Sequence, residues 1–218
     1  KKIYSKNRLL TTIAYRINGK TTYAMEGSIF IAGAGDQWLR DRMKFFKTAP
    51  ETEKIVKSLN DNNNMYLVPA FTGLGAPYWD ANARGVLSGI TRDTSPKEII
   101  RATIEAVAYQ TYDLFEAMKH DGLRPKIVKV DGGMVMNNWF SQFLSDIVNV
   151  KVLRPKVQET TALGAAFMAG LQIGVYKSLK DISKNWHLDK NFSPKMKNQN
   201  RNHFLKGWAS AIKKTLSN

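Results

Sequence analysis

No cysteine occurs among the 218 residues of the chain. A disulfide scaffold, a thiolate zinc site and a cysteine nucleophile are therefore excluded. No apolar run approaches the roughly 18 to 20 residues that a membrane span needs, and the basic first residues lead into no apolar core of the signal-peptide kind. We expect a cytoplasmic protein without a membrane span.

Two further absences narrow the chemistry. The common nucleotide fingerprints, G-x-x-x-x-G-K-[ST] and a G-x-G-x-x-G that follows a strand, are missing. The three histidines, His120, His187 and His203, are isolated from one another and from any metal-ligand spacing. The sequence also suggests no Ser/His/Asp triad. The residues alone therefore predict no metal site and no evident active site.

The composition is that of a globular protein. Hydrophobic residues make up 43%, charged residues 23% and aromatic residues 11% of the chain, which excludes disorder and collagen-like repeats. A chain of this length buries about 70% of its surface on folding. It can therefore build a substantial core.

The net charge of +15 is concentrated at the two ends of the chain. Residues 1–20 carry six basic and no acidic residues, and residues 177–218 carry ten basic and two acidic residues. The stretch between them has 17 basic and 16 acidic residues. A groove that follows a phosphate backbone needs its charge on the folded body. We therefore expect a solvated basic periphery and no nucleic-acid partner, with a basic nucleic-acid-binding module as an alternative of a different class.

Hydrophobic spacing and turn residues predict the order of the elements. Asn18-Gly19 joins the first two strands in a hairpin, and Ser95, Pro96 and Glu98 form the cap of a long helix. The predicted strands are 9–17, 21–25, 65–68, 127–131 and 151–153, and the predicted helices are 27–47, 51–59, 95–119, 137–148, 161–171 and 203–216. This alternation predicts an α/β domain.

Two segments differ from the rest of the chain. Residues 69–90 contain four glycines and two prolines without helical or strand periodicity, and loops of this length in a compact domain are often functional. Residues 177–218 are rich in lysine, asparagine and serine. We interpret them as a basic tail that packs on a core of about residues 7–176.

The end of the predicted strand 127–131 carries the most informative local signal. Gly132 and Gly133 follow it, and Asn137 precedes a helix. Paired glycines let the backbone approach a flat or anionic ligand, and a helix start offers free N–H groups and a positive dipole end. Asn137 can cap the helix or bond the ligand. An ordinary tight turn between strand and helix is the alternative.

The predicted helix 27–47 contains Gly33 and Gly35, each of which costs about 0.5–1 kcal/mol relative to alanine inside a helix. Such a pair indicates either a helix break or a group packed close to the backbone. Gln37 lies one turn after Gly33 and points the same way. Close packing between helices and contact with a ligand both remain open.

Two carboxylates are the best placed for chemistry. Asp80 lies in the glycine-rich segment, and Asp131 lies at a strand end. Each also has a structural interpretation, because Asp80 can pair with Arg84, and Asp131 can bond backbone N–H groups in a turn.

Several motifs resemble the glycerol kinases of the FGGY family of carbohydrate kinases. They are EGSIFIAGA (26–34), QWLRD (37–41), PAFTGLGAPYWD (69–80), ARG (83–85), RATIE (101–105), VDGG (130–133) with the asparagines 137–138, and TALGAA (161–166). The pattern G-x-L-x-G-I (85–90), followed by the residue pair 98–99 and by 102–105, resembles the second signature of the family. The resemblance is dense over residues 7–176 and looser in the tail. GLGAPYWD favours glycerol kinases over sugar-kinase relatives, and another FGGY sugar or polyol kinase is the alternative.

The resemblance implies an actin-like, ribonuclease H-like α/β architecture with a mixed sheet flanked by helices. It also implies that residues 1–218 are the C-terminal ATP-binding domain, with the N-terminal domain absent. That domain would supply the catalytic base, the glycerol site and most ligands of the magnesium ion, so the resemblance implies no catalytic or metal residue in this chain. ATP with Mg²⁺, glycerol, the N-terminal domain and a second copy of the chain in a homo-oligomer are the implied partners.

The resemblance also implies roles for five residues. Gly33 and Gln37 match positions that contact the nucleotide, Gly132 and Gly133 match glycines beside the base and ribose, and Asn137 matches the asparagine that bonds adenine. Met134 stands where a smaller residue such as alanine is expected. A methionine there either packs against adenine or narrows the pocket.

Overall fold

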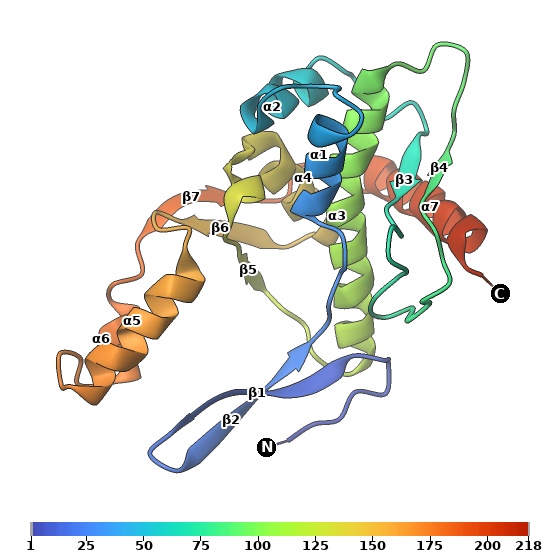
Figure 1. The fold of residues 1–218 in the computed structure, drawn as a ribbon. Coiled ribbons are helices and arrows are strands. Elements are labelled where there is room, and N and C mark those ends of the chain that lie inside the picture. The colour runs from blue at the N-terminus through green and yellow to red at the C-terminus, as the bar shows by residue number, and fades with distance from the viewer. Residues whose placement is uncertain (1, 218) are drawn as a thin grey trace.

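The computed structural model describes residues 2–217. One long helix, α3 (Pro96–His120), runs through the middle of the molecule, and the other elements gather around it (Figure 1). Its start confirms the predicted cap, because Ser95 Oγ accepts a hydrogen bond from Lys97 N and the Glu98 carboxylate accepts one from Ser95 N. Most of its first four turns are buried.

A mixed three-stranded sheet lies beside α3. Strand β5 (Ile127–Lys129) pairs in parallel with β6 (Lys151–Pro155), and β7 (Leu188–Phe192) pairs antiparallel with β6. The sequence predicts no strand at 188–192, because four of its five residues are exposed and the segment lacks the alternation of a half-buried strand. The basic tail thus contributes an edge strand to the sheet.

Two further helices, which contact each other, close the core around α3. Helix α4 (Asn138–Val148) packs against α3, and α7 (Asn198–Thr215) begins five residues before the predicted start. An aromatic cluster joins the three helices: Tyr109 of α3 stacks on Trp208 of α7 with ring centroids 5.2 Å apart and contacts Phe143 of α4 at 5.6 Å. The main hydrophobic core therefore includes residues from the tail.

The predicted helix 27–47 is wrong over most of its length. Only α1 (Gly33–Asp41) is helical. Residues 27–32 are held non-helical against their neighbours, because Ser28 O accepts a hydrogen bond from Ala76 N and a Cβ at Gly27 would lie 2.6 Å from Leu114 Cδ2. After α1, Lys44 adopts a positive φ of 58°. The apolar spacing in these flanks reflects packing of irregular chain and not a helical face.

Helix α2 (Ala49–Lys57) begins two residues before the predicted start. A capping box between Thr48 and Glu51 fixes its first turn, and Pro50 lies in that turn, where its missing N–H costs nothing. The proline therefore belongs to the first turn of this helix.

A hairpin of β1 (Leu10–Ile17) and β2 (Lys20–Glu26) extends from the base of the molecule (Figure 1). Asn18 and Gly19 both have positive φ, 49° and 75°, which confirms the predicted turn. Helices α5 (Thr160–Gln172) and α6 (Leu179–Ser183) lie together at the other lower end of the molecule. Both parts expose apolar side chains, among them Ile13 and Ile173.

Within the glycine-rich segment 69–90, residues 69–85 form a tightly packed loop that follows β3 (Tyr66–Val68). The segment then forms β4 (Val86–Ser88), which pairs antiparallel with β3 and which the sequence did not predict. Leu74 and Asp80 exchange two backbone hydrogen bonds across the loop. The Asp80 carboxylate accepts hydrogen bonds from Asn82 N, Ala83 N and Ser217, and its interpretation as a partner of Arg84 is wrong, because Arg84 donates to the carbonyls of residues 81 and 83. Asp80 thus ties the loop to the end of α7.

Within residues 2–217, no helix combines the length and the apolar character that crossing a membrane would need.

Candidate functional site

A pocket of about 340 Å³ opens where α1, the start of α2 and the segment after β5 meet. That segment forms a short 3-10 helix, η1 (Gly133–Met136), which leads into α4. The pocket lining consists of Asp36, Ala49, Pro50, Thr52, Glu53, Gly133, Met134, Met136 and Asn137. Its volume lies within the range of small-molecule sites.

The glycines at the strand end leave space beside the backbone. Gly132 has a positive φ of 84°, and a Cβ at Gly132 or Gly133 would meet nothing within 4 Å. Internal packing therefore gives no reason for glycine at Gly133. A ligand that approaches the backbone of η1 would require this space.

The two glycines of α1 have different environments. A Cβ at Gly35 would lie 2.8 Å from Thr103 Cγ2 of α3, whereas a Cβ at Gly33 would meet nothing within 4 Å. Gly35 is therefore explained by packing between helices. Gly33 and the exposed Gln37 face open space, which leaves contact with a ligand as an explanation for Gly33.

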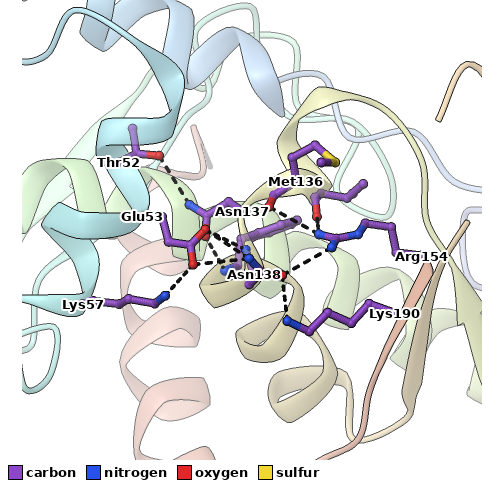
Figure 2. Close-up of polar contacts among 10 residues, drawn as sticks. Thr52, Glu53, Lys57, Met136, Asn137, Asn138, Arg154 and Lys190 are labelled. Atoms are coloured by element: carbon purple, nitrogen blue, oxygen red, sulfur yellow. Dashed lines mark hydrogen bonds and ion pairs between the residues drawn. The ribbon is translucent and has the colours of Figure 1, made fainter. Parts of the chain in front are cut away.

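Asn137 caps α4 and also reaches α2 (Figure 2). Its Oδ1 accepts a hydrogen bond from Phe140 N at 3.0 Å, and its Nδ2 donates to Thr52 Oγ1 at 3.3 Å. The predicted helix cap is thus confirmed. An amide nitrogen carries two protons, so one N–H of Asn137 is left for a ligand in the pocket.

The start of α4 is not free for an anion. Asn138 N donates to Glu53 Oε2 at 3.1 Å, and Glu53 also pairs with Lys57 (Figure 2). Partial burial raises the pKa of Glu53, but the bonds from Lys57 and Asn138 outweigh it and lower the pKa below its usual value. The expectation of free N–H groups at this helix start is therefore wrong for Asn138 and Phe140, because Glu53 and Asn137 engage them.

Arg154 of β6 holds η1 in place. Its buried guanidinium donates to Val135 O at 2.8 Å and to Met136 O at 3.3 Å, and Asp189 of β7 pairs with it at 2.7 Å. Asn138 Oδ1 accepts from both Arg154 and Lys190 (Figure 2). Sequence reasoning missed this role, because only the parallel pairing of β5 and β6 brings Arg154 under η1.

The walls of the pocket suit a flat aromatic ring. Ala49 and Pro50 come from α2, and Met134 and Met136 come from η1, and methionine adapts to planar surfaces. Met134 thus lies in the pocket wall, where it either contacts a bound ring or narrows the space.

Of the residues singled out in the sequence, the pocket brings together Gly133, Met134 and Asn137. Gly33, Gln37 and Gly132 are not part of its lining. Asp131 accepts a hydrogen bond from Thr160 Oγ1 and so links the end of β5 to the start of α5.

The sequence did not predict that residues of α2 line the pocket. The capping box at Thr48 and Glu51 could have located the helix start, but no sequence signal places Thr52 or Glu53 against Asn137 and Asn138. Asp36, on α1, was also overlooked. In residues 2–217 there is no group of three or more acidic or histidine side chains that could hold a metal ion.

The model of the C-terminal domain of the FGGY family of carbohydrate kinases matches residues 4–173. The chain belongs to this family. It is 54% identical over 215 residues to glycerol kinase 1 of Pseudomonas aeruginosa, covering 99% of this chain and 44% of that protein, and 53% identical over 217 residues to a glycerol kinase of Clostridium botulinum, covering 99% and 44%. The chain thus spans less than half the length of the curated relatives it matches.

Solved structures of the family show the same fold. Glycerol kinase from Plasmodium falciparum with ADP superposes with a TM-score of 0.89 at 36% identity, over 100% of this chain and 44% of that chain. Ligand-bound xylulose kinase from Lactobacillus acidophilus gives 0.79 at 24% identity, over 98% and 42%. The predicted actin-like, ribonuclease H-like α/β fold of the FGGY kinases is confirmed.

Proposed function

We propose that residues 1–218 are the C-terminal ATP-binding domain of a glycerol kinase, which transfers the γ-phosphoryl group of ATP with Mg²⁺ to glycerol and forms sn-glycerol 3-phosphate. The relatives named glycerol kinase, and the Plasmodium glycerol kinase that was solved with ADP, support this proposal. The GLGAPYWD loop supports glycerol over other polyols. A cytoplasmic location and a homo-oligomer belong to the same proposal.

The observation that carries the nucleotide role is the pocket at η1. It joins apolar walls, the uncrowded backbone of Gly133 and an unused N–H of Asn137. Adenosine has a flat ring for the walls, and its ring nitrogens can accept from an amide. We assign the base and ribose to Gly132, Gly133 and Asn137.

Gly33 and Gln37 are assigned to the more open end of the site, because Gly33 lies one turn before Asp36 on α1 and outside the pocket lining. A nucleotide that extends from the pocket along α1 would pass them.

We expect this chain to bind the phosphates of the nucleotide less tightly than its base. Glu53 places a carboxylate at the start of α4 and so disfavours a phosphate there. Phosphoryl transfer depends on positioning and on neutralising charge, and the described residues contain no metal-ion cluster. Following the resemblance to glycerol kinases, we assign the base, most of the metal ligands and the glycerol site to the N-terminal domain of the whole enzyme, and we assign no catalytic step to this chain.

The Gly133→Val substitution tests the proposal in this 218-residue chain. Valine would fill the space beside η1, and we expect the dissociation constant of adenosine in titration calorimetry to rise at least about tenfold. Gly164→Val is the matched control: Gly164 also has open space around its Cβ position, but it lies on α5 and outside the pocket. Unchanged adenosine affinity in Gly133→Val, or equal losses in both variants, would contradict the nucleotide assignment.

A further inference from the structure

Asp36 carries a buried atom that lacks a partner. Among the described residues, Asp36 Oδ1 and Tyr66 Oη are the buried side-chain polar atoms without a hydrogen bond. Tyr66 is packed against α7, where its ring would contact any side chain at Gly207. Asp36, in contrast, lines the pocket at η1. Leaving a buried acceptor unpaired destabilises the protein, and a donor on a ligand would remove this cost.

The charged groups around Asp36 are engaged elsewhere. Arg40, one turn further along α1, pairs with Asp41, and Lys57 of α2 pairs with Glu53, the other titratable residue of the lining. On α3, behind α1, Arg101 pairs with Glu105. Burial raises the pKa of Asp36 to about 6. The carboxylate is therefore mainly ionised at neutral pH, and among the described residues no charged side chain contributes to its pKa shift.

The donors of an adenine nucleoside are the 6-amino group and the ribose hydroxyls. The apolar walls formed by Ala49, Pro50, Met134 and Met136 surround the same space that Asp36 lines, and apolar walls favour the base over the ribose. The ribose is joined to the phosphates and so lies toward the open end of the site. The 6-amino group is thus the donor that best fits Asp36.

We propose that Asp36 accepts a hydrogen bond from the 6-amino group of a bound adenine and makes the pocket selective for adenine over 6-oxopurines. This inference rests on the proposed nucleotide role of the pocket. A 6-oxopurine presents a carbonyl oxygen at the same place, which a carboxylate repels, whereas the amino group donates to it. Asp36 is therefore a specificity-determining residue.

Calorimetric titration of this chain with adenosine, inosine and 2′-deoxyadenosine at pH 7.5 tests the inference. We expect the wild-type chain to bind adenosine about 10- to 100-fold more tightly than inosine, the effect of one hydrogen bond to a charged group. Asp36→Asn can present either its oxygen or its nitrogen, so the preference should fall to within about threefold. Asp41→Asn, an exposed carboxylate on the same helix, should keep the wild-type preference.

The wild-type chain provides a second test that does not depend on a variant. Between pH 7.5 and pH 5, protonation of Asp36 should weaken adenosine binding and reduce its advantage over inosine, while Asp36→Asn should show no such trend. A preference that is the same in wild type and Asp36→Asn, or tight inosine binding that depends on Asp36, would overturn the inference. A loss of affinity for 2′-deoxyadenosine that Asp36→Asn abolishes would assign the carboxylate to the ribose and overturn it as well.

The outcomes separate this inference from the proposed function. If adenosine binding is sensitive to Gly133→Val but its preference over inosine is insensitive to Asp36→Asn, only the inference fails. If the wild-type chain binds no adenosine at all, both fail.

Discussion

Asp113 of α3 is expected to make the stability of the protein depend on pH. Its Oδ2 accepts hydrogen bonds from Tyr78 Oη at 2.9 Å and from Trp208 Nε1 at 2.8 Å. It thereby joins the glycine-rich loop and α7 to the central helix. Burial raises the pKa of Asp113 from 3.8 to about 6, although the bonds from Trp208 and Tyr78 oppose the rise.

The direction follows from the raised pKa. The folded protein binds the Asp113 proton more tightly than the unfolded chain, so this residue contributes stability that is fully present below about pH 4 and is lost as the pH rises through 6. A difference of about two pKa units corresponds to about 3 kcal/mol. This is the net cost of the buried charge at pH 8.

The Asp113→Asn substitution removes the charge but keeps an oxygen that can accept both hydrogen bonds. We expect the free energy of unfolding at pH 8, measured by urea denaturation, to rise by about 1–3 kcal/mol over wild type, and the difference to vanish near pH 4. Asp113→Ala is the control, because it leaves Tyr78 and Trp208 without an acceptor and should destabilise the protein at both pH values by about 1–3 kcal/mol.

Two results would refute this reasoning. Asp113→Asn could be less stable than wild type at pH 8, which would show that the carboxylate is net stabilising there. The difference between the two proteins could also stay constant from pH 4 to pH 8, which would show that Asp113 has the same pKa in the folded and unfolded states.

Three further predictions concern the proposed site. The 218-residue chain alone should form no glycerol 3-phosphate above a heat-killed control in a coupled assay, because positioning of both substrates supplies much of the catalysis. Turnover by the pure chain would contradict the assignment of the base to another domain. Adenosine, ADP and ATP should bind the chain with dissociation constants within about one order of magnitude of one another, because Glu53 occupies the start of α4. If calorimetry shows that ATP binds far more tightly than adenosine, the chain contains a phosphate site and the prediction fails. Asn137→Ala should weaken adenosine binding by about 0.5–1.5 kcal/mol. It should also lower the melting temperature, since the cap of α4 is lost. A lower melting temperature with unchanged adenosine affinity would show that Asn137 acts as a helix cap only.

Local signals predicted the elements whose ends are set by neighbours in sequence. The cap at Ser95 and Glu98 located α3, and Asn18-Gly19 located the hairpin, because both are made by residues within four positions of one another. The wrongly predicted helix 27–47 lies mostly in irregular chain. The stretch around α1 has apolar spacing close to that of a helix, but its partners are Ala76 and Leu114, which no local pattern identifies.

The sequence by itself determined the α/β class and the family, and it singled out Gly133 and Asn137, which line the pocket at η1. Gly133 and Asn137 are recognisable because a glycine beside a strand end and an asparagine before a helix have local backbone roles. Tertiary structure decided which other residues line the pocket. Asp36, Thr52 and Glu53 line the same pocket only because α1 and α2 pack against α3 and α2 also packs against α4. Arg154 reaches η1 only through the pairing of β5 with β6. The same packing buries Asp36 and so raises its pKa. This burial depends on residues far apart in the chain.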